Sequence, residues 1–346
     1  MKALVTGGAG FIGCNLVDRL ATDGAEVIVF DALARPGVEQ NLAWLQARHG
    51  EQIIPITADV RDATAVDGIA READVIFHLA AQVAVTTSLA DPREDFEINV
   101  GGAINVLEAA RPRRTPVIFA STNKVYGDLA DIPLELKGDA YRPSDPAVRV
   151  RGVDERRPLD FHTPYGCSKG AADQYVLDYA RSFDLPTCVL RMSCIYGPRQ
   201  LGTEDQGWVA HFLIRALNGE PITIYGDGRQ VRDILFVDDA VEAYVSAFRR
   251  IRDVSGRAFN LGGGPANAVS LLQLLARIED VTERRPAVDF AEWRAGDQRY
   301  YVSDTTRARQ ELALSEPRGW RSGVADLAAW LSGERRAAAR TVEAAA

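Results

Sequence analysis

Short apolar runs alternate with longer amphipathic segments through the first half of the chain. Five runs have the near-continuous apolar character of strands that are covered on both faces: 3–5, 26–30, 53–56, 75–77 and 116–120. Three segments between them carry apolar residues at three- and four-residue spacing, which predicts helices: 11–23, 62–71 and 92–111. Strands and helices that alternate at this pitch predict an α/β fold with a doubly wound parallel sheet.

The pattern becomes irregular after residue 127. The stretch 128–162 is rich in Pro, Asp and Arg and shows little periodicity, so we expect a long loop of the kind that is usually functional or mobile. Further along, the spacing of apolar residues predicts three helices and two strands: helices 164–182, 206–218 and 270–280, and strands 187–190 and 222–225.

These elements divide the chain into two interleaved α/β units and a tail. The larger unit is expected to comprise residues 1–192, with 227–260 returning to it, and the smaller, substrate-binding unit residues 193–226 and 261–330. Residues 331–346 have little to bury and are expected to form a flexible tail. The 346 residues fit this division, since a domain typically takes roughly 150.

Charge and composition exclude several classes of function. The 40 Lys and Arg residues against 48 Asp and Glu residues give a net charge of −8, so we expect no nucleic-acid partner. No uncharged apolar stretch approaches the roughly 20 residues that span a bilayer, so we expect no membrane partner either. The four cysteines lack the spacing of a metal site, and we therefore expect no metal and a reduced, cytoplasmic location.

A glycine-rich turn, Thr-Gly-Gly-Ala-Gly-Phe-Ile-Gly, follows the first expected strand and opens the first helix. Gly7, Gly10 and Gly13 permit a tight turn, a close approach of the backbone to a pyrophosphate, and close packing of the helix on the strand. Free N–H groups at the start of that helix, around Phe11 and Ile12, are expected to hold the phosphates of a dinucleotide.

A carboxylate ends the second expected strand. Asp31 comes 18 residues after Gly13, where it can accept hydrogen bonds from both hydroxyls of an adenosine ribose and repel a 2′-phosphate. This position favours NAD over NADP as the cofactor, although Arg35 lies close by in the sequence.

The ends of the next two strands are expected to complete the dinucleotide site. Asp59 and Val60 follow the third strand and are placed to meet the adenine, although an ordinary surface turn explains Asp59 nearly as well. Leu79, Ala80 and Ala81 follow the fourth strand, where mostly small side chains leave room for a cofactor.

Tyr165 and Lys169 lie four residues apart on one face of an expected helix. A free tyrosine has a pKa of about 10, so a general base at neutral pH needs a nearby positive charge that favours the phenolate. We expect Lys169 and a nicotinamide ring to supply this charge. Thr122 follows the fifth strand at the carboxyl edge of the sheet, where its hydroxyl can share the proton that Tyr165 moves.

Together these residues resemble the extended short-chain dehydrogenase/reductases that act on nucleotide sugars, the NAD-dependent epimerase/dehydratase family. The resemblance runs from residue 1 to about residue 315. Three stretches look specifically like the CDP-sugar 2-epimerases of the CDP-paratose and CDP-tyvelose type: 121–129, 159–175 and 205–209. The resemblance implies a Rossmann fold, tightly held NAD, and a homo-oligomer, either a dimer or a tetramer.

The resemblance also implies a reaction, the epimerisation of a CDP-linked hexose or deoxyhexose at C2. The phenolate of Tyr165 takes the proton of the C2 hydroxyl, assisted by Thr122, as hydride passes to NAD⁺; the 2-keto sugar turns its other face and the hydride returns. Lys169 holds the nicotinamide ribose. The family further suggests eight substrate-binding residues: Thr122, Asn123, Gln200, Gln206, Trp208, Arg232, Arg294 and Asp297.

Several alternatives stay open. Trp208 is explained equally well as a core aromatic residue, whereas solvated surface residues are the less favoured interpretation of Arg232 and Arg294. The same catalytic residues would serve at C4, so a nucleotide-sugar 4-epimerase is the enzymatic alternative, and a non-catalytic NAD-binding regulator is another. The 4,6-dehydratases place Asp-Glu where this chain has Asn123-Lys124, and an amide and an ammonium cannot replace the carboxylates that eliminate water.

The chain departs from the family at two places. Many relatives have Asp-Asn-Leu-Ser-Arg where this chain has Asp-Ala-Leu-Ala-Arg at 31–35, so two polar partners of the adenosine ribose are missing. Many relatives also carry an Asn near the sugar where this chain has Met192 and Cys194. The groups that recognise the sugar are therefore not defined by the sequence.

Overall fold

Seven parallel strands form the central sheet of the computed structural model, which describes the backbone of residues 1–345 and the side chains of residues 1–334. In spatial order they are β12 (Arg257–Leu261), β8 (Thr187–Met192), β5 (Val117–Thr122), β4 (Val75–His78), β1 (Lys2–Thr6), β2 (Glu26–Asp31) and β3 (Ile53–Thr57). The strand order reverses beside β1, as in a doubly wound Rossmann sheet, so the expected fold class is confirmed.

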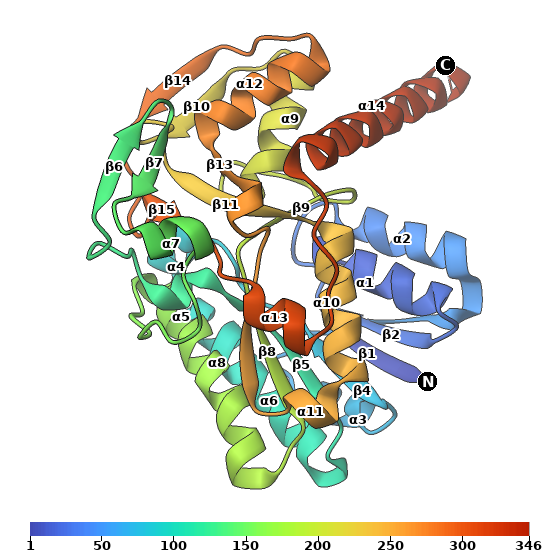
Figure 1. Ribbon diagram of the computed structural model, residues 1–346. Helices are drawn as coiled ribbons and strands as arrows, with labels where there is room; N and C mark the ends of the chain where they lie inside the picture. Colours follow the sequence, from blue (N-terminus) through green and yellow to red (C-terminus); the bar gives the residue numbers. More distant parts are fainter. Residues whose placement is uncertain (346) are drawn as a thin grey trace.

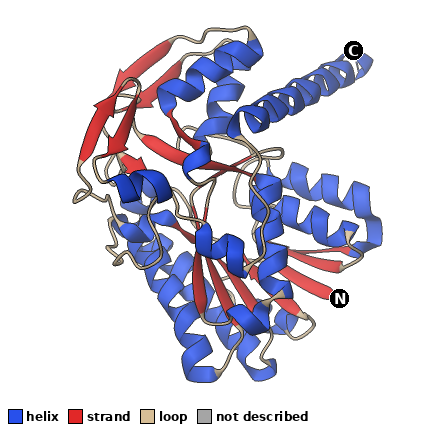
Figure 2. Ribbon diagram, viewed as in Figure 1, coloured by secondary structure: helices blue, strands red, loops and turns tan. Residues whose placement is uncertain are grey.

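Apolar side chains point alternately to the two faces of this sheet, and helices cover both faces (Figures 1 and 2). Ala3, Val5 and Val29 face one hydrophobic core, whereas Leu4 and Ile28 face the other. The first core is covered by α1 (Phe11–Thr22), α2 (Val38–His49) and α10 (Val237–Arg249), and the second by α3 (Ala63–Ala70), α6 (Gly102–Ala110) and α8 (Thr163–Phe183). Burial on both faces explains why these strands are apolar throughout.

A smaller lobe lies beyond the carboxyl ends of the central strands (Figure 1). Its mixed sheet consists of β9 (Cys194–Tyr196), β11 (Val231–Phe236), β13 (Ala268–Ser270) and β15 (Tyr300–Tyr301). Beside this sheet lie the parallel pair β10 (Ile222–Tyr225) and β14 (Val288–Ala291) and two helices, α9 (Trp208–Asn218) and α12 (Leu271–Thr282).

The remaining elements are short, apart from the last helix. They are α4 (Val85–Ala90), α5 (Pro92–Phe96), α7 (Pro146–Arg151), α11 (Ile251–Val254), α13 (Thr306–Glu311) and α14 (Trp320–Ala345), the strands β6 (Leu134–Lys137) and β7 (Ala140–Pro143), and the turns η1 (Gly50–Gln52), η2 (Glu97–Gly101), η3 (Arg111–Arg113), η4 (Asn123–Tyr126) and η5 (Pro265–Asn267). None of the helices in the described part of the chain combines the length and the hydropathy that a membrane crossing requires.

In three segments the structure adds detail that the apolar pattern does not predict. The stretch 128–162 is not a loop throughout, because it contains the hairpin β6–β7 and helix α7. Within 227–260, β11 pairs in the smaller sheet, and only the part from α10 onward joins the larger unit. Residues 331–345 continue α14, with Leu331 buried, whereas Ala346 lies outside the described residues. The boundaries of the two units and the mobility of the tail stay predictions.

A buried ion pair fixes helix α8 against the sheet. Arg191 on β8 donates from Nε and Nη2 to the two carboxylate oxygens of Asp173 on α8, at 2.9 Å each, and the two side chains are 5% and 0% exposed. Ser121 at the end of β5 donates to the same carboxylate at 2.7 Å. Because α8 also carries Tyr165 and Lys169, this pair positions the expected catalytic residues relative to the strand ends.

We predict that Asp173→Ala lowers the free energy of unfolding by about 3–5 kcal/mol, because it leaves the Arg191 guanidinium buried without a counter-charge. Asp178→Ala is the matched control: it removes an exposed carboxylate that pairs with Arg181 on the same helix, and we expect no measurable loss. Urea unfolding followed by circular dichroism measures both variants. Equal midpoints for the two variants would contradict the structural role given to the buried pair.

Candidate active site

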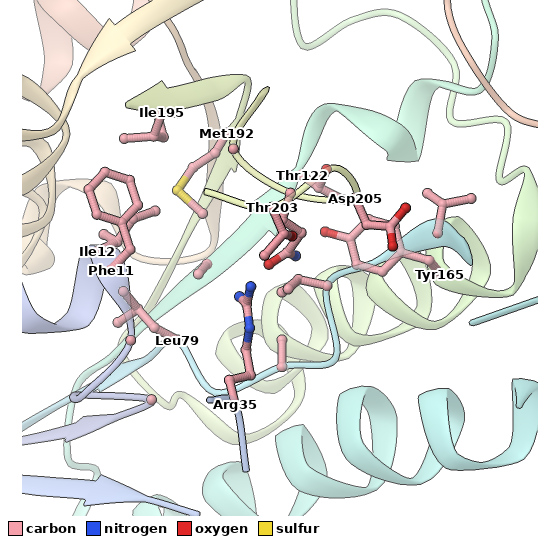
Figure 3. A pocket seen from close by; sticks show the side chains of 18 of the residues that line it. Phe11, Ile12, Arg35, Leu79, Thr122, Tyr165, Met192, Ile195, Thr203 and Asp205 are labelled. Carbon is pink, nitrogen blue, oxygen red and sulfur yellow. The ribbon is translucent and has the colours of Figure 1, made fainter. Parts of the chain in front are cut away.

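One cavity of about 910 Å³ lies between the carboxyl edge of the central sheet and the smaller lobe. All residues that the sequence indicates for cofactor, catalysis and substrate line it: Gly7, Gly10, Phe11, Ile12, Gly13, Asp31, Asp59, Val60, Leu79, Ala80, Ala81, Thr122, Asn123, Tyr165, Lys169, Gln200, Gln206, Trp208, Arg232, Arg294 and Asp297. Figure 3 shows Thr122 and Tyr165 in this cavity together with Arg35 and Asp205. The structure thus brings the expected residues together, although their roles stay predictions.

The glycine turn packs tightly at one end of the cavity. Gly7 has a φ of +69°, and its N–H donates to the carbonyl of Phe30 at 2.8 Å. A Cβ on Gly7 would lie 2.7 Å from the amide nitrogen of Ala80, and one on Gly13 would lie 2.1 Å from the carbonyl oxygen of Gly7. No side chain caps the N-terminus of α1, so its first N–H groups are available to an anion.

The two acidic residues on the adenosine side are already hydrogen-bonded. Asp31 accepts from the N–H groups of Ala9 at 3.0 Å and Leu33 at 2.9 Å, one on each carboxylate oxygen, which orients the carboxylate at the end of β2. Asp59 is held by Arg61 in a two-pronged ion pair that lowers the pKa of the Asp59 carboxyl. The carboxylate of Asp59 is therefore committed to Arg61, a contact that its sequence position did not indicate.

Tyr165 and Thr122 form the expected catalytic pair at the carboxyl end of β5. The two side chains are 8% and 7% exposed, and both line the cavity. Burial raises the pKa of Tyr165 to about 12, and the nearby hydroxyl of Thr122 acts against this rise. The protein groups by themselves therefore keep the phenol neutral, whereas the sequence pattern predicts a lowered pKa.

Lys169 lies one helical turn beyond Tyr165 and is 3% exposed. Its Nζ lies 4.2 Å from the centroid of the Phe119 ring, a cation–π contact. Burial lowers the pKa of the Lys169 ammonium to about 7, and the negative charges of Asp173 and Asp95 oppose this effect. The charge of this lysine is therefore sensitive to small changes in its surroundings.

Asn123 and Lys124 are fixed by a loop of the smaller lobe. Asn123 donates to the side-chain oxygen of Gln298 at 3.0 Å, and Gln298 donates to the carbonyl of Gly127 at 2.6 Å. The Nζ of Lys124 donates to the carbonyl of Gly296 at 2.8 Å. These contacts tie the segment that follows Thr122 to the loop that carries Arg294 and Asp297.

The substrate side of the cavity contains a buried cation without a counter-charge. The guanidinium of Arg232 is 8% exposed and donates to the carbonyl of its neighbour Val231, and it forms no ion pair with any side chain of residues 1–334. Nearby, Gln200 donates to the carbonyl of Ile195, while its buried side-chain oxygen has no protein partner among these residues. Unpaired charge and an unpaired acceptor in one cavity are typical of a polar, anionic ligand site.

Other expected substrate residues are already engaged with the protein. Arg294 stacks 3.6 Å from the centroid of the Tyr225 ring and contacts the carboxylate of Asp205 at 3.3 Å, so it is less available than Arg232. The indole N–H of Trp208 points to the sulfur of Cys194 at 3.3 Å. The remaining two members lie on loops of the cavity wall: Gln206, paired with Thr203, and Asp297, 3.9 Å from Lys124.

The sequence did not indicate Gln230, which lines the cavity and is 5% exposed. Its amide donates to the carbonyl of Tyr225, and its side-chain oxygen has no partner among the described residues. The signal that could have found it is the two-residue period of a strand, because Gln230 and Arg232 share one face of β11 and its approach.

Comparison with known proteins places the fold and site in a family. The model of the NAD dependent epimerase/dehydratase family matches residues 3–262. CDP-paratose 2-epimerase of Salmonella typhi is 42% identical over 341 residues, covering 96% of this chain and 99% of that protein.

Two solved structures extend the comparison. UDP-glucose 4-epimerase of Thermotoga maritima with UDP-glucose has a TM-score of 0.83 at 30% identity, covering 96% of this chain and 99% of that chain. UDP-glucose 4-epimerase of Thermus thermophilus in complex with NAD has a TM-score of 0.81 at 30% identity, with the same coverage of 96% and 99%. The family expected from the sequence is confirmed. The chain is a member of the NAD-dependent epimerase/dehydratase family, an NAD-dependent nucleotide-sugar epimerase.

Proposed function

We propose that this enzyme inverts C2 of a CDP-linked hexose or deoxyhexose. The observation that carries the proposal is the presence, in one cavity, of a buried tyrosine and threonine and of an unpaired buried arginine. The first pair is suited to moving the proton of a sugar hydroxyl, and the arginine to holding a diphosphate. The nature of the sugar and nucleotide rests on the likeness to CDP-paratose 2-epimerase over nearly the whole chain.

The residues of the glycine turn fit a bound dinucleotide. Gly10 lines the cavity. A Cβ at this position would lie 3.1 Å from the carbonyl oxygen of Gly7 and would otherwise enter open space. We propose that the N–H groups after Gly10 hold the pyrophosphate and that Asp31 binds the adenosine ribose. The other proposed contacts come from Gly7, Phe11, Ile12, Gly13, Asp59, Val60, Leu79, Ala80, Ala81, Tyr165 and Lys169. Bound NAD would supply a reversible hydride acceptor and a positive charge.

The proposed roles of the catalytic residues follow from their burial. Tyr165 takes the proton from the C2 hydroxyl and later returns it, while the hydroxyl of Thr122, which favours the phenolate, shares that proton. Because burial raises the pKa of Tyr165 to about 12, the phenolate requires positive charge close by. Lys169, held on the same helix, provides this charge from the protein and binds the nicotinamide ribose.

The proposed substrate contacts come from both lobes. Arg232 holds the diphosphate, with Arg294 as a second contact once it leaves Asp205. Asn123 and Asp297 lie closer to the strand end, where the sugar would meet Tyr165. The other three proposed contacts also line the cavity: Gln200, Gln206 and Trp208.

A nucleotide-sugar 4-epimerase is the second candidate, because the two solved structures compared above are UDP-glucose 4-epimerases that share the fold. Tyr165 and Thr122 would act in the same way on a C4 hydroxyl, so the seating of the sugar decides between them. A non-catalytic NAD-binding regulator is the weaker alternative, since it gives no reason for a buried tyrosine, threonine and lysine around one cavity.

We further propose that the enzyme works as a cytoplasmic homo-oligomer, a dimer or a tetramer. Large apolar side chains are exposed on the helices of the larger unit, among them Phe96 on α5 and Tyr175 and Phe183 on α8. Exposed apolar residues on neighbouring helices are suited to packing against a second copy.

The proposed function is tested with a panel of CDP-, UDP- and GDP-sugars, incubated without added cofactor and followed by NMR. The proposal expects inversion at C2, with a CDP-sugar as the preferred substrate. Inversion at C4 alone would reject the proposal in favour of the second candidate, and the absence of any epimer would favour the regulator.

Gly13→Ala is predicted to impair NAD binding, because the added Cβ would lie 2.1 Å from the carbonyl oxygen of Gly7 and force the turn to move. Overpacking of this kind costs about 1–3 kcal/mol, which corresponds to a loss of NAD affinity of about fivefold to 150-fold. Gly68→Ala is the control, since no described atom lies within 4 Å of a Cβ there. NAD retained after gel filtration is measured, and equal retention in both variants would contradict the proposed cradle.

Tyr165→Phe is predicted to reduce kcat by about 10²-fold or more, because it removes the group that accepts the sugar proton and leaves the ring in place. Bound NAD should stay within a few-fold of the original content. Tyr175→Phe is a matched control on the same helix: it removes a hydroxyl that lies outside the cavity and keeps the ring, so it should keep full activity. Retained epimerase activity in Tyr165→Phe would contradict the role of Tyr165 as the proton acceptor.

A further inference from the structure

A buried carboxylate lies against the helix that carries the proposed catalytic residues. Asp95 on α5 is 1% exposed and does not line the cavity, so it has no part in the function proposed above. Its oxygens accept from the amide of Gln82 at 2.9 Å, from the amide of Asn99 at 3.1 Å, and from the hydroxyl of Ser168. All three donors are neutral, so the hydrogen bonds hold the carboxylate without cancelling its charge.

The donors themselves are fixed by further contacts. Asn99 lies in the single wide π-helical turn η2 and also donates to the hydroxyl of Ser168 at 3.0 Å, while its side-chain oxygen accepts from the backbone N–H of Gln82 at 3.0 Å. Ser168 directly precedes Lys169 on α8. The network therefore holds one particular carboxylate against Ser168, the residue next to Lys169.

Lys169 has few other sources of negative charge. Nearby titratable and charged groups are Asp95 on α5, Tyr165 and Asp173 on α8, and His78 on β4, with Arg191 on β8 beyond Asp173. Asp173 is already paired with Arg191, and burial lowers the pKa of His78 to about 3, so this imidazole is neutral. Unlike Asp173, Asp95 forms no ion pair with any of the described side chains, so its negative charge is not neutralised by direct contact.

The electrostatic effects of Asp95 and its neighbours are mutual. Burial raises the pKa of Asp95, and the positive charge of Lys169 opposes this rise. The negative charge of Asp95 in turn raises the pKa of Lys169 and that of Tyr165. Loss of this one charge would move both neighbouring titrations to lower pH.

We propose that Asp95 is a positioning residue whose negative charge sets the pH range in which Lys169 is protonated while Tyr165 can give up its proton. It acts through Lys169 and Ser168 and touches neither substrate nor cofactor. The inference rests on the function proposed for Lys169 and Tyr165. Burial of a carboxylate among neutral donors costs folding free energy. A role in setting the charge of Lys169 gives a reason why the enzyme keeps this carboxylate.

The variant Asp95→Asn removes the charge and can keep the hydrogen bonds. The amide oxygen can accept from Gln82 and Asn99, and the amide nitrogen can donate to Ser168, whose hydroxyl can still donate to the carbonyl of Tyr165, 3.2 Å away. Glu97→Gln is the matched control, because it removes a neighbouring carboxylate that is 48% exposed on η2.

Two pH profiles test the proposal between pH 5.5 and 10: kcat for the preferred sugar nucleotide, and NAD retained after gel filtration. We predict that Asp95→Asn moves the whole kcat profile to lower pH by about one unit or more, and that it loses NAD at a lower pH than the original enzyme. On the acid side of the optimum the variant should therefore have the higher kcat, and on the alkaline side the lower kcat. Glu97→Gln should keep both original profiles.

A lower kcat with unmoved profiles would show a merely structural role and overturn the proposal, as would profiles identical to the original. If Asp95→Asn does not fold, Ser168→Ala provides the test: it removes one donor to the carboxylate, so a smaller shift in the same direction is expected, and no shift overturns the proposal. The NAD readout separates the two proposals. A shifted NAD profile without epimerisation of any CDP-sugar rejects the proposed function and leaves the role of Asp95 intact.

Discussion

Burial of Tyr165 and Lys169 at the carboxyl edge of the sheet is the constraint on which the rest of the site depends. Exclusion of water drives both side chains toward their neutral forms, raising the pKa of the phenol to about 12 and lowering that of the ammonium to about 7. Proton transfer from a sugar requires the charged forms instead, a phenolate at Tyr165 and an ammonium at Lys169. The surrounding groups must therefore restore these charges, and Thr122, Asp95 and Asp173 are the protein groups placed to affect them.

The site also depends on hydrogen bonds that hold the two lobes in a fixed position relative to each other. Asn123 and Lys124 directly follow Thr122, the proposed catalytic threonine, and both donate to the loop at 296–298, which carries Asp297. The proposed sugar contacts and the proposed proton-transfer pair are thereby joined by hydrogen bonds between side chains and backbone. Carboxylates in the places of Asn123 and Lys124 would turn these donors into acceptors, which explains how the same fold can be suited to epimerisation or to dehydration.

Local patterns predict the part of the site that lies at strand ends. Gly7, Asp31 and Thr122 follow buried strands, and parallel strands bring their carboxyl ends to one edge, so the sequence could place these residues around one cavity. Contacts between distant segments could not be predicted in this way. Asn123 meets Gln298 across 175 residues, and the pairing of Arg294 with Asp205 depends on how two loops meet.

Dependence on distant contacts also explains why parts of the fold were not predicted. The hairpin β6–β7 lacks a regular apolar face, so its residues resemble a loop until β11 and its neighbours are present. Asp95 lies in a helix of five residues and looks in sequence like a solvated acid, because its burial depends on α8. Periodicity records which face an element buries and contains no information about which distant residue it meets.

The central claim is that C2 is inverted by removal and return of its own hydrogen, with Tyr165 handling only the hydroxyl proton. The most direct measurement uses a CDP-sugar that is deuterated at C2, incubated in ordinary water with the enzyme, with the product examined by NMR and mass spectrometry. The account predicts a C2 epimer that keeps its deuterium. Replacement of the deuterium by solvent hydrogen during inversion would show that C2 loses its hydrogen as a proton, which would contradict the account.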